Sequence, residues 1–187
     1  MRLRDAPHGA KRIGKHRLEV TWAAGKRLFE DEAPYQEGDL DGVRWAYCGY
    51  DPKLRLHLIF KACRPAFTGA LLDDVTGALL PGGQDVLFTT DQQDYVAYEM
   101  ADGDTTEILK VYRRNGEILW TGHNGFTSAD NGSVVVAFHN LHWNSQNRLG
   151  TLAVPADGAK PFTITLTPNR SGKWNWERKR PAASPGP

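Results

Sequence analysis

The sequence of 187 residues has an ordinary globular composition, with 40% hydrophobic and 24% charged residues, which argues against a fibrous or wholly disordered chain. Its length suits one domain around a single hydrophobic core. No run approaches the roughly 20 apolar residues of a membrane-spanning helix, and the first residues have no apolar core of a secretory signal, so we expect a cytoplasmic protein.

The net charge of +1 hides an uneven distribution of charges. Residues 1–17 hold six Lys or Arg and one Asp, and residues 168–187 hold five Lys or Arg and one Glu. The body from 18 to 167 therefore holds 12 basic against 20 acidic residues. We expect a basic flexible tail over 1–17, a single all-β domain over 18–167, and a basic Trp-containing segment with a flexible tail over 168–187.

Alternation of apolar and polar residues predicts the first strands at 18–22 and 43–47. The segment 26–42 between them is rich in Asp and Glu, and we expect a loop there with at most one helical turn. A turn at 50–53 then leads into a strand in which the apolar positions of one face are Leu54, Leu56, Leu58 and Phe60. This turn pairs Cys48 with a residue near Arg55 instead of Cys63, so both cysteines are expected to be free, half-buried thiols.

Further strands are predicted at 70–73, 86–90, 94–100, 106–113, 117–121, 133–139, 149–154 and 161–167. Within this region the sequence repeats itself at a distance of 39 residues. Thr76-Gly-Ala-Leu-Leu-Pro-Gly-Gly83 with Phe88-Thr-Thr-Asp91 corresponds to Asn115-Gly-Glu-Ile-Leu-Trp-Thr-Gly122 with Phe126-Thr-Ser128. Gly25 and Gly158 mark two weaker copies. Each copy predicts a strand, a tight turn and a second strand.

These two repeats resemble the blade repeats of WD40-like and related β-propeller proteins, in which a hairpin closes one blade and a Phe-Ser/Thr turn opens the next. The resemblance covers residues 43–167 and lacks the Trp-Asp and Gly-His signatures of WD40 blades. It implies an all-β fold of antiparallel sheets, as an incomplete or small propeller-like array of at most four blades of about 40 residues. A β-sandwich is the alternative.

Two groups of residues have the chemistry of metal ligands, and neither predicts a cofactor. His123, His139 and His142 lie close in sequence, but on a regular strand His139 and His142 face opposite sides, and no Cys or Glu completes a tetrahedral set. The acidic stretches could supply oxygen ligands to calcium, yet neither has the alternating pattern of a calcium loop. These stretches contain Glu30, Asp31, Glu32, Glu37, Asp39 and Asp41, and Asp102, Asp104 and Glu107.

Catalysis and nucleic-acid binding have weaker support in the sequence. The chain has no nucleophile elbow, phosphate loop or dinucleotide fingerprint. A carbohydrate-active hydrolase or lyase would have to use Asp91, Asp130, Asp102 or Glu107 as its acid and base. The segment 173–180 mixes Trp with Lys and Arg, as proteins that bind single-stranded nucleic acids do. The net negative charge of residues 18–167, however, repels the phosphates of a nucleic acid.

The function that we expect is therefore protein binding. An acidic body suits a partner with a basic surface, and Trp is enriched among the residues that anchor interfaces. In general character the chain looks like bacterial inhibitor or immunity proteins that neutralise a toxic enzyme. An alternative is a structural subunit whose edge strands join neighbours. The expected contact residues are Asp39, Asp41, Asp102, Asp104, Trp120 and Trp143.

Overall fold

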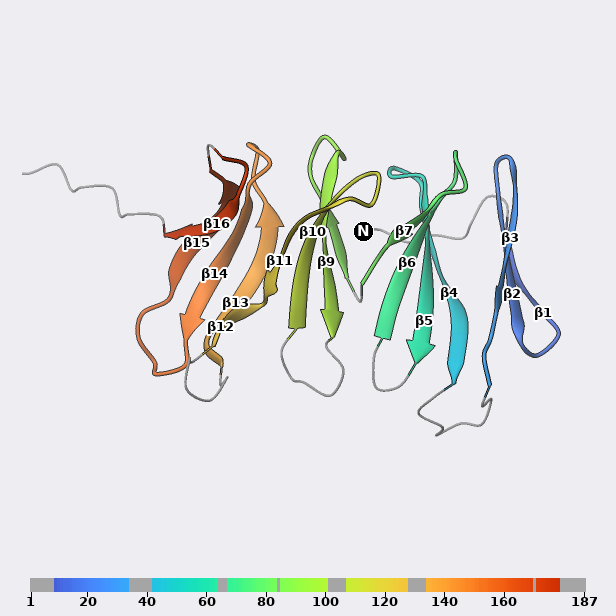
Figure 1. Ribbon diagram of the computed structural model, residues 1–187, viewed down its shortest axis with the longest axis horizontal. Helices are drawn as coiled ribbons and strands as arrows, with labels where there is room; N and C mark the ends of the chain where they lie inside the picture. Colours follow the sequence, from blue (N-terminus) through green and yellow to red (C-terminus); the bar gives the residue numbers. More distant parts are fainter. Residues whose placement is uncertain are drawn as a thin grey trace, which may run out of the picture. The chain divides into compact units, whose positions relative to one another are not determined.

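The computed structural model describes residues 9–33, 42–63, 67–83, 85–100, 107–127, 134–169 and 171–178. These residues form 16 strands in four antiparallel sheets and no helix (Figure 1). The all-β class expected from the sequence is confirmed. No candidate for a membrane-crossing helix occurs in these ranges.

Every strand pairs with the strand that precedes or follows it in the sequence. Sheet 1 consists of β1 (Ala10–Ile13), β2 (Arg17–Trp22) and β3 (Gly25–Glu30). Sheet 2 consists of β4 (Val43–Asp51), β5 (Leu56–Cys63), β6 (Phe67–Asp73) and β7 (Leu79–Pro81). Sheet 3 consists of β8 (Val86–Phe88), β9 (Asp94–Met100), β10 (Glu107–Arg113) and β11 (Ile118–His123). Sheet 4 consists of β12 (Gly125–Thr127), β13 (Val134–Trp143), β14 (Leu149–Pro155), β15 (Phe162–Pro168) and β16 (Trp174–Arg178).

The chain divides into two compact units. The first unit comprises residues up to 87 together with 92–122, and the second comprises 88–91 together with the residues from 123 onward. Sheets 1 and 2 and most of sheet 3 belong to the first unit, and sheet 4 belongs to the second.

Several sequence-based expectations about local structure are wrong. Residues 25–30 form β3, which overlaps the segment 26–42 that was expected to be a loop, and residues 10–13 form β1 inside the segment expected to be a flexible tail. The turn between β4 and β5 spans residues 52–55, two residues later than expected, with Arg55 at a φ of 55°. The register shifts between Tyr47 and Gly49, so Cys48 lies at a bulge near Leu58 instead of pairing with Arg55, and it is exposed.

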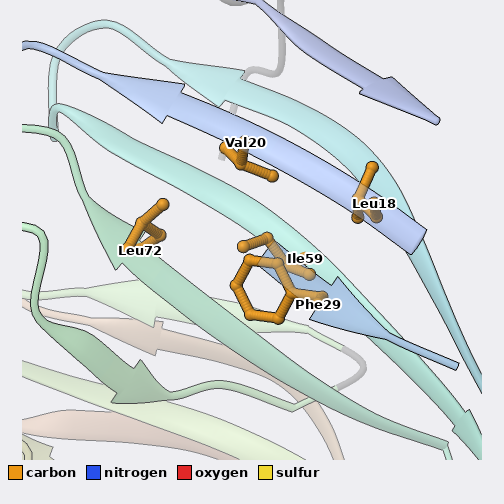
Figure 2. Packing of buried hydrophobic residues seen from close by; sticks show 5 residues of the cluster. All are labelled: Leu18, Val20, Phe29, Ile59 and Leu72. Atoms are coloured by element: carbon orange, nitrogen blue, oxygen red, sulfur yellow. The ribbon is translucent and has the colours of Figure 1, made fainter. Parts of the chain in front are cut away.

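Sheets 1 and 2 share a hydrophobic core (Figure 2). Leu18, Val20 and Phe29 contribute from β2 and β3, and they pack on residues of β5 and β6, which are Ile59 and Leu72. All five are at most 5% exposed. Burial of side chains of this size stabilises the fold by about 1.5–3 kcal/mol each, so this core joins sheet 1 to sheet 2.

After β7, the backbone at Gly82 and Gly83 lies very close to the backbone of β6 and β9. A Cβ atom on Gly83 would lie 1.8 Å from the carbonyl oxygen of Tyr98 in β9, and one on Gly69 would lie 2.3 Å from the carbonyl oxygen of Gly83. Gly82 also donates its N–H to the Gly69 carbonyl at 2.9 Å. Because backbone packs against backbone here, the link between sheets 2 and 3 has no room for a side chain.

Hairpin turns of the three sheets meet at one end of the first unit, which we call the turn end. The Ala23 N–H, in the β2–β3 turn, donates to the carbonyl of Asp74 in the β6–β7 turn at 3.3 Å. Arg114, in the β10–β11 turn, donates to the Leu54 carbonyl at 2.8 Å and to the Asp73 carboxylate at 3.1 Å. Four turns of the first unit are therefore tied together by hydrogen bonds.

The edge of sheet 2 at β4 is closed by side chains from sheet 1. Asp31 accepts the Trp45 N–H at 2.9 Å, and Arg12, which pairs with Asp31, donates to the Trp45 carbonyl at 2.8 Å. The backbone of Val43 forms a bridge with Glu32. An exposed edge strand invites pairing with other chains, and these contacts block that edge.

Sheet 4 curls strongly. The rings of Phe138 on β13 and Trp176 on β16 lie 4.8 Å apart, although β14 and β15 lie between these two strands in the sheet. In a flat sheet, β13 and β16 would be about 14 Å apart. Phe126 adds an edge-on contact to Phe138 at 5.1 Å. In sheet 4, Phe138, Leu149 and Leu166 are buried, whereas Phe126 is 38% exposed.

Candidate functional site

Four of the six expected contact residues lie outside the described residues. These are Asp39 and Asp41, between β3 and β4, and Asp102 and Asp104, between β9 and β10. Trp120 lies in β11 of the first unit and Trp143 ends β13 of the second unit, and both are half-buried. The structure therefore gives geometry for the surroundings of Trp120 and for the strand ends next to the acidic stretches.

Those strand ends lie on the same side of the first unit. The four joined turns follow β2, β4, β6 and β10, so the starts of β4 and β10 point away from the turn end. Antiparallel pairing then brings the ends of β3 and β9 to this opposite end as well. These four strand ends, which flank the acidic stretches in the sequence, therefore lie at the end of the first unit opposite the turns (Figure 1).

The ring of Trp120 lies along its own strand. A Cβ atom on Gly122 would lie 2.3 Å from the ring, so only glycine leaves space for it. The hairpin closes with the Arg113 N–H bonded to the Glu117 carbonyl at 2.8 Å, and β11 lies next to β10 in sheet 3. The indole thus occupies the middle of a surface strand.

The neighbouring strands β10 and β9 of sheet 3 hold a half-buried ion pair. Lys110 Nζ lies 2.6 Å from Glu99 Oε2, and Tyr112 donates its hydroxyl to Glu99 Oε1 at 3.0 Å. Burial, followed by the charge of Glu99 and its hydrogen bond, raises the pKa of Tyr112 far above its ordinary value. Because both carboxylate oxygens are occupied, Glu99 is held as part of the sheet instead of serving as a reactive group.

The acidic residues considered for catalysis are not brought together. Asp91 accepts hydrogen bonds from Thr89 at 2.7 Å and from Asn147 at 2.6 Å, which fixes the β13–β14 turn within the second unit. Glu107 begins β10 of the first unit. Asp102 and Asp130 lie outside the described residues. No pair of carboxylates with a catalytic spacing emerges from the residues that can be placed.

The three histidines considered as metal ligands are surface residues. The register of β13 shifts between His139 and His142, where Asn140 has a φ of 56°. Their partners, Leu152 and Gly150, are two residues apart, so both histidines share a face and the expectation that they face opposite sides is wrong. Within the described ranges, no three His, Cys, Asp or Glu side chains gather closely enough to hold a metal.

The aromatic and basic C-terminal segment is partly used within the fold. Trp176 packs on Phe138, and the Arg178 guanidinium lies 4.1 Å from the centre of the Phe162 ring. One Trp ring and one guanidinium of the segment, groups on which the bases of a single strand could stack, therefore contact other residues of sheet 4.

A buried polar network that the sequence analysis missed lies near the turn end. His57 is 0% exposed and lies 3.2 Å from Asp74 through Nε2 and 3.1 Å from the Tyr47 hydroxyl through Nδ1. Asp74, which is 2% exposed, also accepts from Tyr50 at 3.3 Å and from Arg55 at 3.5 Å. In this geometry Asp74 holds the imidazole in place, and the network connects β4, β5 and the β6–β7 turn.

Two other carboxylates of the first unit are stabilised in their charged form. Burial would raise the pKa of Asp31, but hydrogen bonds from Arg12 and the Trp45 N–H outweigh it and lower the pKa below 3.8. For Asp73, burial is likewise outweighed by the N–H groups of Thr76 and Val75 and by Arg114, and its pKa is lowered.

A folded-state pKa below the unfolded value makes stability depend on pH in a defined direction. The contribution of Asp31 is present above its unfolded pKa of 3.8 and is lost as pH falls through the folded value. We expect Asp31→Asn to lower the free energy of unfolding at about pH 6, and we expect this difference from the wild type to shrink below about pH 4. Urea denaturation followed across this pH range measures it, and a constant difference would contradict it.

The sequence matches no protein-family model, and comparisons of the chain with curated proteins and with solved structures give no significant match. The fold and the described sites therefore define an all-β protein of four antiparallel sheets, and its function has to be argued from its own residues.

Proposed function

We propose that the chain is a protein-binding module that binds a partner with a basic surface at the end of the first unit opposite the turns. The observation that carries the proposal is the position of the strand ends next to the two acidic stretches. The residues proposed to contact the partner there are Asp39, Asp41, Asp102 and Asp104, together with Trp120 on β11. Trp143 is proposed as a further contact from the second unit.

The charge distribution supports this choice of surface. In the first unit, the described carboxylates of Glu19, Asp31, Asp73, Asp74 and Glu99 are each paired with a Lys, Arg or His of the same unit. The acidic residues that account for the excess negative charge of residues 18–167 are therefore largely other ones, and they include those of the stretches 34–41 and 101–106. A surface with one sign of charge accelerates association with a partner of the opposite sign.

The framework that we propose for this module is a small or incomplete propeller-like array in which each sheet is one repeat. In support, Gly77 and Gly116, the glycines of the two clearest sequence repeats, lie in the turns before β7 and β11, the last strands of sheets 2 and 3. Gly25 and Gly158 lie at the turns before β3 and β15.

As the biological role of this module, we propose inhibition of a toxic enzyme, in the manner of bacterial immunity proteins. The support is the acidic body together with the lack of an assembled catalytic pair among the described residues. A cytoplasmic location fits this role. The alternatives remain a carbohydrate-active enzyme and a subunit of an assembly, and they give different outcomes in the experiment below.

The test is capture of a partner by the purified chain from a lysate of its native organism. We expect one enzyme to be retained in stoichiometric amount and to lose activity when the chain is added. Replacement of Asp39, Asp41, Asp102 and Asp104 by Asn should weaken the measured affinity by about a hundredfold, because charge pairs at an interface contribute more than 1 kcal/mol each. The double variant Trp120→Ala/Trp143→Ala should weaken it as well.

The matched control changes acidic residues elsewhere. Asp157→Asn with Glu177→Gln, both on the second unit, should leave the affinity within about twofold of the wild type. Equal binding by the fourfold Asn variant would refute the proposed surface. If the wild-type chain retains nothing at high concentration, the binding role fails, and glycan cleavage and concentration-dependent oligomerisation become the next measurements.

A further inference from the structure

The bulge in β13 brings two histidines to the same face of sheet 4. In the antiparallel pairing with β14, His139 lies opposite Leu152 and His142 lies opposite Gly150. The two histidines are three positions apart in their own strand, but their partners are two positions apart. Side chains two positions apart on a strand point to the same side of the sheet. Both imidazoles therefore share a face, and both are exposed there.

The backbone and a buried side chain hold this bulge in place. Asn140 has a φ of 56°, in the left-handed region that Asn adopts more readily than most residues. Thr151, which is 0% exposed, donates its hydroxyl to the His139 carbonyl at 2.8 Å. The separation of the two histidines is therefore set by the sheet. Two positions along a strand span about 7 Å, and two imidazoles at this separation can reach one metal ion between them.

A hydrogen bond of His142 prepares its other ring nitrogen to bind a metal. Its Nδ1 atom lies 2.8 Å from the carbonyl oxygen of Asn140. A carbonyl oxygen only accepts hydrogen bonds, so Nδ1 carries the proton, and Nε2 of the neutral ring keeps its lone pair. Histidines that bind metals almost always donate their other ring N–H to a carbonyl, a carboxylate or water, which fixes the tautomer and the orientation of the ring.

The residue opposite His142 leaves space beside this nitrogen. A Cβ atom on Gly150 would lie 3.0 Å from Nε2 of His142 and 3.1 Å from its Cε1 atom. Gly150 does not have a positive φ, so its backbone conformation does not require glycine. The lack of a side chain at this position instead gives room to the edge of the ring that carries the lone pair.

We propose that His139 and His142 together bind one divalent transition-metal ion, of the class of zinc, nickel and copper. Imidazole nitrogen suits these metals, and the affinity of such a site is highest for Cu²⁺. Among the residues that the structure describes, no third His, Cys, Asp or Glu gathers with this pair, so water completes the coordination of the metal. The site belongs to sheet 4 of the second unit, and it does not depend on the protein-binding function proposed above.

The experiment is a calorimetric titration of the full chain, carrying no affinity tag, with zinc chloride. We expect saturable binding of one zinc ion per chain. His139→Ala and His142→Ala should each weaken the affinity at least about tenfold, because the second imidazole binds the same ion at a high effective concentration. His123→Ala is the matched control, since His123 is also an exposed histidine of the second unit, and it should change the affinity less than about twofold. Circular dichroism shows whether all three variants are folded.

Two spectroscopic readouts need no variant. Nitrogen NMR of the metal-free chain should show His142 as the tautomer with its proton on Nδ1. With one equivalent of Cu²⁺, electron paramagnetic resonance should show two imidazole nitrogens bound to the metal.

Several outcomes would overturn the site. These are no saturable zinc binding by the wild type, an unchanged affinity in either His139→Ala or His142→Ala, and an equal loss in His123→Ala. A stoichiometry of one zinc ion per two chains would also overturn it, because the metal would then join two copies instead of lying within one strand.

Discussion

Gly83→Ala should lower the free energy of unfolding by about 3 kcal/mol or more, a size of effect that follows from forced overpacking or backbone displacement. The added methyl group would lie 1.8 Å from the Tyr98 carbonyl oxygen and 2.7 Å from its carbonyl carbon. Both are backbone atoms, so no side chain can rotate away to relieve the overlap. Urea denaturation followed by tryptophan fluorescence measures the change.

The control for this substitution is Gly14→Ala, which has nothing within 4 Å of its added methyl group but a φ of +63°. Its cost is conformational only and should be about 1 kcal/mol. A loss at Gly83 no larger than the loss at Gly14 would show that the chain between β7 and β8 has room to move. The close approach of sheets 2 and 3 would then not be a strict requirement.

Asp74→Ala should lower the free energy of unfolding by about 3 kcal/mol, because it removes a buried acceptor shared by several donors. His57 and Tyr50 both lie within hydrogen-bond distance of this carboxylate, and His57 is 0% exposed. Tyr50→Phe removes a single donor and should cost about 1 kcal/mol. Equilibrium denaturation of both variants provides the comparison.

The double variant of these two residues tests the network itself. If Asp74 and Tyr50 interact, the cost of Asp74→Ala with Tyr50→Phe should be less than the sum of the single costs by about 0.5 kcal/mol or more. Strict additivity, or an Asp74→Ala variant no less stable than Tyr50→Phe, would mean that the contacts around His57 contribute little to the fold.

Most strands could be predicted from alternating apolar and polar residues, because each of these strands has one face in contact with solvent and one face buried. The predicted strands at 94–100 and 149–154 correspond closely to β9 and β14. Strands in charged segments, among them β1 and β3, were missed. In β1 and β3 the Lys and Arg side chains obscure the apolar residues, and Arg12 and Lys26 are held by ion pairs with Asp31 and Glu19, which no local pattern reveals.

The candidate site was predicted only in part, for reasons of long-range geometry. The alternation at 54–60 puts His57 on the face opposite the apolar residues Leu54, Leu56, Leu58 and Phe60, yet His57 is fully buried because sheet 1 covers that face of sheet 2. A sequence pattern with period two shows which residues share a face, but it does not show whether another sheet covers that face. The bulge in β13 likewise reversed the expected facing of His139 and His142, since one extra residue shifts the alternation.

The exclusive pairing of consecutive strands also affects the order in which the chain acquires its structure. Strand partners lie close in the sequence, from three residues apart at Trp22 and Gly25 to 20 residues apart at Val43 and Cys63. Contacts of such short sequence separation form rapidly, since little loop entropy is lost. During synthesis, which proceeds at about 5–20 residues per second, the hairpins of sheet 1 can close before sheet 4 has left the ribosome. Folding of this chain can therefore proceed in the direction of translation, one sheet after another.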